Sequence, residues 1–367
     1  MYRTASQVQE VIPLQIPAKK FAPKKTLVAM SGGVDSSAAA ALLLEQGHAC
    51  GGVTLKLLAD GDPAAPQAAQ AVAERLGIPF HIFEFSEAFG RAVLRPFAES
   101  YLRGETPNPC VDCNKHIKFP AVLARAQALN YDSIATGHYV RREFAGGRFL
   151  LRRAVDHNKD QSYFLYALTQ AQLARTQFPL GGMTKTQVRA LAEAHGFVNA
   201  KQRDSQDICF IPGGDYGAFL ERYLGYALPP GDFVDISGNV LGTHRGTPRY
   251  TLGQRKGLGL ALPQPGYVVE ICSEKNMVVV GEEAALFSRE VLAKNVNFIA
   301  MESLQQPVRC LAKIRYRQKE QPATAEQIDA DTIRVVFDEP QRAITPGQAV
   351  VLYDGEYVIG GGTIAKG

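Results

Sequence analysis

One short segment near the start of the chain restricts the fold more than any other. An apolar run, residues 26–30, precedes Ser31-Gly-Gly-Val-Asp-Ser-Ser37, and an alanine- and leucine-rich stretch follows and ends at Gly47. The run predicts a buried strand, and the stretch predicts a helix that Gly47 terminates. The two glycines let backbone N–H groups, serine hydroxyls and the positive end of the helix converge on one point. The segment therefore predicts a phosphate-binding loop, with a spacing unlike the Walker loop or the Gly-x-Gly-x-x-Gly dinucleotide loop.

Strands and helices alternate after this loop. Strands are predicted at residues 51–58, 79–85 and 132–136, and helices at 67–76 and 121–129. Another helix opens at Thr184-Lys-Thr-Gln187, which has the pattern of a capping box, and closes at Gly196. This alternation predicts a parallel sheet flanked by helices.

The second half of the chain differs in composition and in its pattern of apolar residues. After about residue 212, glycine and proline become frequent, long helical patterns end, and short β-rich runs appear at 267–271, 277–280, 333–337, 349–353 and 357–359. The expected fold class is an α/β N-terminal domain with a parallel sheet, a small central linker domain and a C-terminal β-barrel. The expected boundaries are a flexible extension at 1–25 and domains at 26–212, 213–282 and 283–367.

Composition limits the classes of partner and compartment. The net charge of +4 permits a polyanionic partner without demanding one. No apolar stretch approaches the roughly 20 residues that span a bilayer, so we expect a cytoplasmic protein with no membrane partner. Residues 1–25 carry several basic side chains and three prolines. This pattern favours a disordered extension, with an organellar transit peptide as the alternative.

Three of the six cysteines suggest chemistry. Cys110 and Cys113 form a Cys-x-x-Cys pair on a proline-rich stretch, and Cys209 lies between Ile208 and Phe210. Three cysteines and His116 could ligate zinc, and three cysteines alone could hold an iron–sulfur cluster. Alternatively, one thiolate carries sulfur as a persulfide and another releases it by closing a disulfide. Cys209 could also be an ordinary buried apolar residue.

Charged residues near these cysteines are expected to affect the protonation of the thiols. Lys115, His116 and Lys118 make the first loop electropositive, which favours the thiolate form of its cysteines. Lys201 and Asp204 could tune the environment of Cys209.

Six motifs in order carry a resemblance to a known family. They are Asn108-Pro-Cys-x-x-Cys-Asn114, Ala135-Thr-Gly-His-Tyr139, Lys159-Asp-Gln-Ser-Tyr-Phe-Leu165, Asp207-Ile-Cys-Phe210, Tyr250-Thr-Leu-Gly-Gln-Arg-Lys-Gly-Leu-Gly259 and Lys313-Ile-Arg-Tyr-Arg-Gln318. Together they resemble the tRNA-specific 2-thiouridylases from about residue 26 onward. The phosphate loop itself resembles that of the ATP pyrophosphatases, which split ATP to AMP and pyrophosphate.

The resemblance implies a site for each substrate. It makes Cys113 the sulfur-carrying nucleophile and Cys209 its partner, and we expect Asp35 to contribute to Mg²⁺ binding. The implied ATP-binding residues are Ala29, Met30, Ser31, Gly32, Gly33, Val34, Asp35, Ser36, Leu55 and Gly137. The implied tRNA contacts are Asn108, Pro109, Cys110, His138, Lys159, Asp160, Gln161, Arg315, Tyr316 and Gln348.

Two departures from the family pattern bear on the mechanism. Many members carry aspartate where this chain has Cys110, and three candidate cysteines favour an iron–sulfur cluster on Cys110, Cys113 and Cys209 as the alternative sulfur source. The stretch after residue 58 is short and lacks the aromatic residue usual after the second strand, which leaves the adenine contacts open there.

Basic segments in the second half suit an RNA partner. Arg245, Arg249, Arg255 and Lys256 accompany Tyr250, and Lys313, Arg315, Arg317 and Lys319 alternate around Tyr316, as on the basic face of a strand. By resemblance the partners are lysine, glutamate and glutamine tRNAs and a persulfide donor supplied by a cysteine desulfurase or a sulfur relay protein. The resemblance implies an enzyme that adenylates the 2-oxygen of the wobble uridine and then transfers sulfur from Cys113. Alternatives are a non-catalytic tRNA-binding protein and a metabolic ligase with the same loop.

Overall fold

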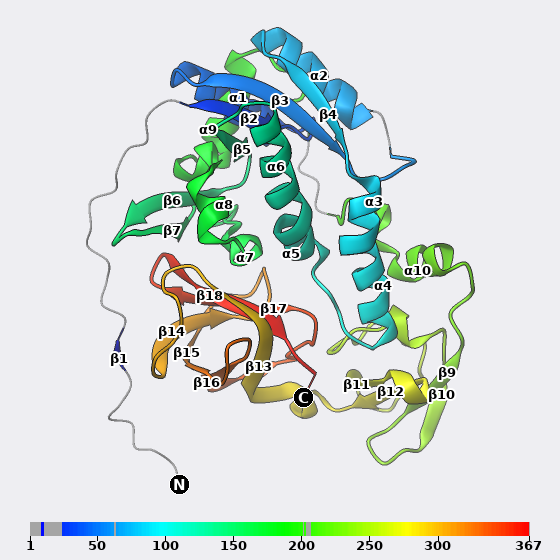
Figure 1. Ribbon diagram of the computed structural model, residues 1–367. Coiled ribbons are helices and arrows are strands. Elements are labelled where there is room, and N and C mark those ends of the chain that lie inside the picture. Colours follow the sequence, from blue (N-terminus) through cyan, green and yellow to red (C-terminus); the bar gives the residue numbers. More distant parts are fainter. Residues whose placement is uncertain (1–8, 11–23, 62–63, 201, 203–206, 367) are drawn as a thin grey trace.

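The computed structural model describes residues 9–10, 24–61, 64–200, 202 and 207–366. Most of the predicted N-terminal extension, together with Lys201 and Asp204, lies outside the described residues. Three units follow one another along the chain: a parallel sheet with helices, a small mixed sheet and a β-barrel (Figure 1). This order confirms the predicted fold class.

The first unit is built on a five-stranded sheet in which all neighbouring strands are parallel. Its strand order is β4 (Phe80–Glu84), β3 (Ala49–Lys56), β2 (Lys25–Ala29), β5 (Ser133–Thr136) and β8 (Thr176–Gln177). The strands predicted at 51–58, 79–85 and 132–136 are confirmed within a few residues.

Helices cover both faces of this sheet. Small apolar side chains of α1 (Val34–Glu45), α2 (Ala64–Leu76) and α9 (Lys185–Ala194) share one core cluster with Val28 of β2. Side chains of α6 (Pro120–Ala128) pack with Leu27, the preceding residue of the same strand, in another cluster. Successive residues of a strand point to opposite faces, so the apolar run of β2 is buried on both sides.

A long excursion between β4 and β5 carries the cysteine pair. It comprises α3 (Ser86–Phe89), a π-helical turn at Gly90–Leu94, α4 (Arg95–Leu102), α5 (Pro109–Cys113) and a second π-helical turn at Asn114–Lys118 that leads into α6. Figure 1 shows α3 and α4 beside α5 and α6, extending toward the middle unit. The helices at 86–102 were not predicted from the sequence.

The rest of the first unit links the sheet to the barrel. The hairpin β6 (Val140–Ala145) and β7 (Arg148–Arg153) is followed by α7 (Ser162–Leu165) and α8 (Gln170–Ala174). A 3-10 turn at Pro179–Gly182 precedes α9, and Thr184 caps α9 in the predicted capping box. Strand β7 pairs with the barrel through Arg152 and Tyr357.

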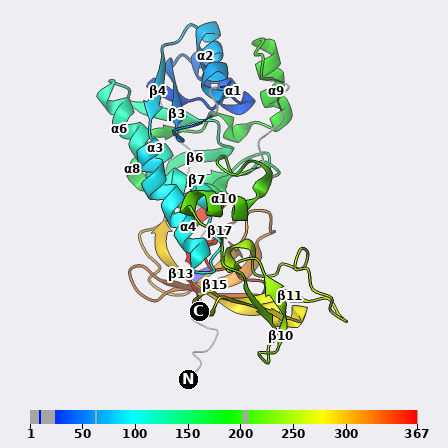
Figure 2. The ribbon, with the colours of Figure 1, turned by 90° about the vertical axis from the view of Figure 1, so that its right-hand side faces the viewer.

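The middle unit is small. Helix α10 (Tyr216–Leu224) leads into a sheet ordered β10 (Val240–His244), β9 (Gly231–Val234), β12 (Met277–Gly281) and β11 (Tyr267–Cys272). The expectation that helical patterns end after residue 212 misses α10, whose N-cap Asp215 and left-handed Gly225 are ordinary helix signals. Figure 2 shows this unit projecting beside the barrel.

Six strands of the last unit close into a barrel. In order around it they are β14 (Val308–Lys313), β15 (Gln321–Gln327), β16 (Ile333–Arg342), β13 (Phe287–Phe298), β18 (Tyr357–Ile364) and β17 (Ala349–Asp354), which pairs back to β14. Strand β1 (Gln9–Glu10) adds to β14 in parallel. Closure removes free sheet edges, so a barrel of short strands can bury its own core.

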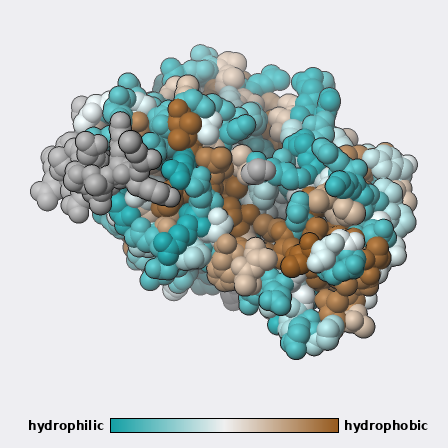
Figure 3. Space-filling model, turned by 90° about the horizontal axis from the view of Figure 1, so that it is seen from below, coloured by the Kyte–Doolittle hydropathy of each residue, from teal (hydrophilic) through white to brown (hydrophobic). Residues whose placement is uncertain are grey.

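The surface and the helices add two observations. Seen from the barrel side, hydrophilic side chains cover much of the molecule, with a hydrophobic stretch toward one side (Figure 3). No helix in the described part of the chain has the length and apolar character needed to cross a bilayer.

Candidate active site

The predicted phosphate loop has the geometry of an anion site. The backbone N–H of Ser31 donates to the Ser36 hydroxyl at 3.1 Å, and the Ser36 and Ser37 hydroxyls donate to the Gly33 carbonyl at 3.1 and 3.0 Å. Gly32 has a φ of +77°, and a Cβ there would lie 2.6 Å from the Ala65 carbonyl oxygen. The serines therefore hold the turn closed, and only glycine fits at position 32.

Other predicted nucleotide residues surround this loop at the carboxyl end of the sheet. Met30 and Val34 are buried in the core, so these two could meet a nucleotide only through their backbone. Gly137 packs directly on the loop, because a Cβ there would lie 2.8 Å from the Ser36 nitrogen. Ala29 and Leu55 occupy the ends of β2 and β3 that lead to the same edge.

A lysine far along the sequence neutralises the acidic residue of the loop. The ammonium of Lys185 lies 2.7 and 2.8 Å from the two carboxylate oxygens of Asp35, and the Tyr139 hydroxyl donates to one of them at 2.7 Å. Lys185 is buried at the start of α9, and its backbone N–H donates to Asp156 at 2.9 Å. Both carboxylate oxygens of Asp35 are thus engaged by Lys185 in this structure.

A buried asparagine supports the loop from behind. The Asn199 amide donates to the Gly32 carbonyl at 2.6 Å and to the Ser37 hydroxyl at 3.0 Å. The residue is 6% exposed, and its side-chain oxygen has no partner among the described residues. Asn199 therefore ties the loop to the segment that leads toward Cys209.

The structure brings the three cysteines of interest into one region. Cys113 on α5 packs in an apolar cluster with Phe210 and Ile211, the residues that follow Cys209. Cys209 directly precedes those two residues, and Cys110 lies on the same short helix as Cys113. Cys110 and Cys209 reach the surface, whereas Cys113 is buried.

Burial controls the protonation of these thiols. It raises the pKa of Cys113 to about 11 and also raises the pKa of Cys110 and Cys209, while Lys118 opposes the shift at all three. The prediction that nearby basic residues leave a thiolate is therefore wrong for this state of the protein, because desolvation outweighs the single effective cation. Asp112, between the two cysteines, has a pKa raised by burial to about 6.

The segment expected to contact RNA near the loop is tied to the phosphate site. Gln161 and Tyr139 exchange two hydrogen bonds of 2.9 Å, and Tyr139 is the residue that touches Asp35. Asp160 accepts from the Ser162 hydroxyl at 2.7 Å and from the Ala154 nitrogen at 3.0 Å, so its carboxylate shapes the turn around Lys159.

His138 lies beside Phe119, and its Nδ1 is 2.8 Å from the Thr136 hydroxyl. Burial, with a contribution from Lys118, lowers the pKa of His138 to about 3, so the imidazole is neutral.

The barrel meets both the segment before the cysteine helix and helix α7, which directly follows residues 159–161. The Tyr316 ring lies 4.4 Å, centroid to centroid, from Phe164 on α7. The Gln348 amide donates to the Thr106 carbonyl at 2.8 Å, just before Asn108 and Pro109. Arg315 donates to the Ala343 carbonyl at 2.6 Å and to the Thr345 hydroxyl at 3.0 Å. Tyr316 and Gln348 therefore contact residues near the cysteine helix, whereas these hydrogen bonds of Arg315 stay within the barrel unit.

Comparisons with known proteins agree with this arrangement. Three family models match in succession: the tRNA methyl transferase HUP domain at residues 24–213, the tRNA methyl transferase PRC-barrel domain at 217–282 and the aminomethyltransferase beta-barrel domain at 288–364. The tRNA-specific 2-thiouridylase MnmA of Carboxydothermus hydrogenoformans is 50% identical over 360 residues, covering 94% of this chain and 98% of that protein. The MnmA of Clostridioides difficile is 45% identical over 358 residues, covering 94% and 99%. The chain belongs to the tRNA-specific 2-thiouridylase (MnmA) family.

Among solved structures the likeness is remote. The NMN synthetase of Francisella tularensis shares 15% identity at a TM-score of 0.35, covering 56% of this chain and 79% of that one, which is too low to support an argument.

Part of the basic segment at residues 245–256, which was expected to contact RNA, is not on the surface. Arg249 pairs with Glu221 at 2.8 Å and with Asp215 at 3.7 Å, and Tyr250 is buried, so both belong to the interior of the middle unit. Arg245, Arg255 and Lys256 remain exposed.

The basic stretch in the barrel also differs from the prediction. Strand β14 ends at Lys313, and the residues that follow form a turn instead of the predicted strand. Arg315 is partly buried in that turn, whereas Arg317 and Lys319 are exposed.

Three residues of this 2-thiouridylase site were missed at the sequence level. Lys185 and Asn199 contact the phosphate loop from 150 or more positions away, and Asp112 gains its raised pKa only through burial. The capping box that opens α9 was recognised, but nothing in its pattern indicated that Lys185 would point to Asp35.

The described residues contain no group of three or more histidine, cysteine or acidic side chains arranged to hold a metal ion. Cys110, Cys113 and Cys209 therefore do not form a ligand set in this conformation, with or without His116.

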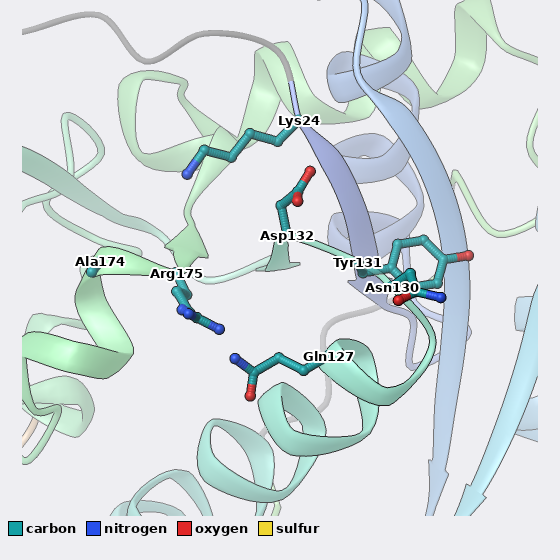
Figure 4. A pocket seen from close by; sticks show the side chains of 7 residues that line it. All are labelled: Lys24, Gln127, Asn130, Tyr131, Asp132, Ala174 and Arg175. Carbon is teal, nitrogen blue, oxygen red and sulfur yellow. The ribbon is translucent and has the colours of Figure 1, made fainter.

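The 2-thiouridylase chain also has a pocket of about 530 Å³ that lies away from the phosphate loop (Figure 4). Lys24, Asp132 and Arg175 line it and precede β2, β5 and β8. Because the strands are parallel, these positions lie at the amino edge of the sheet, opposite the phosphate loop, and the pocket is not part of the site described above.

Proposed function

We propose that this chain is an ATP-dependent tRNA-uridine 2-sulfurtransferase that replaces the 2-oxygen of the wobble uridine in lysine, glutamate and glutamine tRNAs. One observation carries the proposal. A chain of the 2-thiouridylase family holds an intact phosphate loop, and Gln161 and Tyr139 connect that loop to a segment bordering the cysteine site. The location is the cytoplasm, and the divisions 26–212, 213–282 and 283–367 are the catalytic, central tRNA-contacting and barrel domains.

The first step activates the base. The uridine 2-oxygen attacks the α-phosphorus of ATP, pyrophosphate leaves, and the 2-oxygen carries AMP. The loop backbone from Ser31 to Ser36 binds the phosphates with the help of the α1 dipole. Lys185, already held at the loop, supplies positive charge for phosphate oxygens, and Asp35 becomes available to Mg²⁺ when that ion pair opens.

The second step transfers sulfur. A persulfide donor places a sulfur atom on Cys113, and its terminal sulfur attacks carbon 2 of the base while AMP leaves. The Cys209 thiolate then attacks the Cys113 sulfur, which forms a disulfide between the two residues and leaves 2-thiouridine on the tRNA. An external thiol must reduce that disulfide before the next turnover. The packing of Cys113 against Phe210, the residue after Cys209, supports this pairing.

The base must leave its stack to reach either site. We assign contacts with the flipped base to Asn108, Pro109 and Cys110, which lie next to Cys113 in the chain, and to His138 as a neutral hydrogen-bonding group. Tyr316 and the segment from Lys159 to Gln161 offer aromatic and polar contacts nearby.

The alternative source of sulfur would be an iron–sulfur cluster, which Cys110, Cys113 and Cys209 would have to rearrange to hold and which would supply sulfide. Cys110 favours it, since a persulfide mechanism needs only two cysteines. Iron and labile sulfide in anaerobically purified protein would support the cluster, and their absence from active protein would exclude it.

The decisive experiment uses metal-free protein with ATP–Mg²⁺, unmodified glutamate tRNA and a persulfide donor, with nucleosides identified by mass spectrometry. We expect 2-thiouridine from the unaltered chain and none from Cys113→Ser, while AMP formation with tRNA persists in that variant. Thiolation by Cys113→Ser would refute the assignment of the nucleophile. Absence of AMP formation by the unaltered chain would instead favour a non-catalytic tRNA-binding protein.

A further inference from the structure

The two cysteines of the Cys-x-x-Cys pair differ in accessibility. Cys110 is exposed, whereas Cys113 is only 6% exposed and packs in the apolar cluster that also holds Phe210 and Ile211. A persulfide that arrives on a donor protein is transferred when an acceptor thiolate attacks its outer sulfur atom, so the acceptor must be accessible to a large molecule. In this structure such a donor can meet Cys110 at the surface, while the apolar cluster covers Cys113.

Helix α5 places the two thiols next to each other. The helix spans Pro109–Cys113, so Cys110 and Cys113 are three positions apart within it. Side chains at this spacing share one face of an α-helix, with about 5–6 Å between their Cβ atoms. The outer sulfur of a persulfide extends about 2 Å beyond the cysteine sulfur. Rotation of the two side chains can therefore bring a sulfur atom carried by Cys110 to the Cys113 thiolate.

Contacts at both ends of α5 keep this arrangement in place. The Asn108 carbonyl accepts from the Val111 backbone N–H at 3.0 Å, which closes the first helical turn. At the other end, the Asn114 amide donates to the Phe164 carbonyl at 3.0 Å. A helix of 5 residues is too short to be stable alone, so these contacts and the packing of Cys113 hold the exposed thiol beside the buried one.

Cys209 is the other exposed thiol of the site, and the proposed reaction already uses it. After sulfur transfer Cys209 attacks the Cys113 sulfur, so it must carry a free thiol at that moment. Its segment meets Cys113 through the packing of Phe210 and Ile211, whereas Cys110 shares a helix with Cys113. A persulfide mechanism gives Cys110 no other covalent step, so it is the thiol that remains available to receive sulfur.

We propose that Cys110 is the sulfur-receiving residue of this chain, a role that rests on the proposed function. The Cys110 thiolate attacks the outer sulfur of a persulfide on the donor protein, whose sulfur–sulfur bond breaks and which leaves as a thiol. The Cys113 thiolate then attacks the outer sulfur of the Cys110 persulfide. Cys110 takes up the proton that Cys113 released, and the persulfide now lies on Cys113. Each step breaks one sulfur–sulfur bond and forms another, so no oxidant or reductant is needed.

Two donors of different size test this relay in the full chain without tRNA or ATP. The small donor is glutathione hydropersulfide, and the bulky donor is the same persulfide coupled to a polyethylene glycol chain too large to enter the protein. Persulfides are trapped by alkylation after short reaction times and located by peptide mass spectrometry. The variants are Cys110→Ser, Cys113→Ser and Cys209→Ser. Cys272→Ser is the matched control, because Cys272 is a partly exposed thiol of the middle unit.

With the bulky donor we expect sulfur to appear first on Cys110 and later on Cys113. In Cys113→Ser the sulfur should stay on Cys110. In Cys110→Ser, loading of Cys113 by the bulky donor should fall about tenfold or more, because the transfer between neighbouring thiols is lost. The small donor should load Cys113 in that variant with a much smaller loss of rate, which also shows that the variant is folded. Cys272→Ser should load Cys113 at the rate of the unaltered chain.

Equal loading of Cys113 by the bulky donor in Cys110→Ser and in the unaltered chain would overturn the proposal, as would a lack of sulfur on Cys110 in Cys113→Ser. Slower loading in Cys209→Ser but not in Cys110→Ser would also overturn it and assign the receiving role to Cys209. If neither donor loads Cys110 or Cys113, the relay and the persulfide route fail together. If sulfur passes from Cys110 to Cys113 but the loaded protein forms no 2-thiouridine with ATP and tRNA, the relay stands and the proposed function fails.

Discussion

Replacing Lys185 by methionine removes the cation from the phosphate loop while nearly preserving the shape of the side chain. Both carboxylate oxygens of Asp35 lose a partner at 2.7 and 2.8 Å. The side chains of Lys185 and Asp35 are 11% and 32% exposed, so water replaces the lost bonds only in part. The variant therefore leaves a half-buried carboxylate whose remaining described contact is the Tyr139 hydroxyl.

The size of the effect follows from these contacts. Hydrogen bonds to charged groups contribute about 1.5–3 kcal/mol when partly buried. In a domain of this size, each kcal/mol corresponds to about 2–4 °C of melting temperature. We therefore expect Lys185→Met to lower the melting temperature of the nucleotide-free protein by about 3–12 °C.

A matched control and a double variant make the reasoning refutable. Lys56 pairs with Glu84 at 3.0 Å, but both side chains are about half exposed, so Lys56→Met should cost at most about 1 kcal/mol. Asp35→Asn combined with Lys185→Met should cost less than the sum of the two single changes, because the isolated carboxylate is gone. Thermal unfolding of all four variants measures this. Equal losses for Lys185→Met and Lys56→Met, or strictly additive single changes, would refute the reasoning.

Three further predictions concern the site. The alkylation rate of Cys113 should rise about tenfold per pH unit between pH 7 and 10, because a pKa of about 11 keeps the thiol mostly protonated throughout that range. A plateau near pH 8 would contradict burial as the cause. The His138 ring should stay neutral down to about pH 4 in an NMR titration, because burial holds its pKa near 3, and protonation near pH 6.5 would show that the ring is solvated. Gly137→Ala should weaken ATP binding, because the added methyl group would press on the Ser36 nitrogen. Gly182→Ala should leave the affinity unchanged, because a methyl group there meets open space. Equal ATP affinities of the two variants in a calorimetric titration would count against contact between Gly137 and the loop.

The local sequence determined the elements that depend on neighbours in the chain. The phosphate loop, the strands at 51–58, 79–85 and 132–136 and the capping box at Thr184 were all predicted, because apolar runs, glycines and capping residues act within a few positions. The order of six motifs was also sufficient to identify the family. The helices at 86–102 and α10 were missed, since their apolar faces acquire a clear meaning only when they pack together in one cluster.

Only the tertiary structure decided which distant side chains meet at the site and which protonation state Cys113 has. Lys185 meets Asp35 across 150 positions, Asn199 meets Gly32 across 167, and Gln348 meets Thr106 across 242. No local pattern records such pairings, because side chains that far apart become neighbours only when the sheet, the excursion and the barrel have folded. The protonation of Cys113 has the same origin. The sequence displays the basic residues beside it, but the desolvation that outweighs them comes from the apolar residues that the fold packs around the thiol.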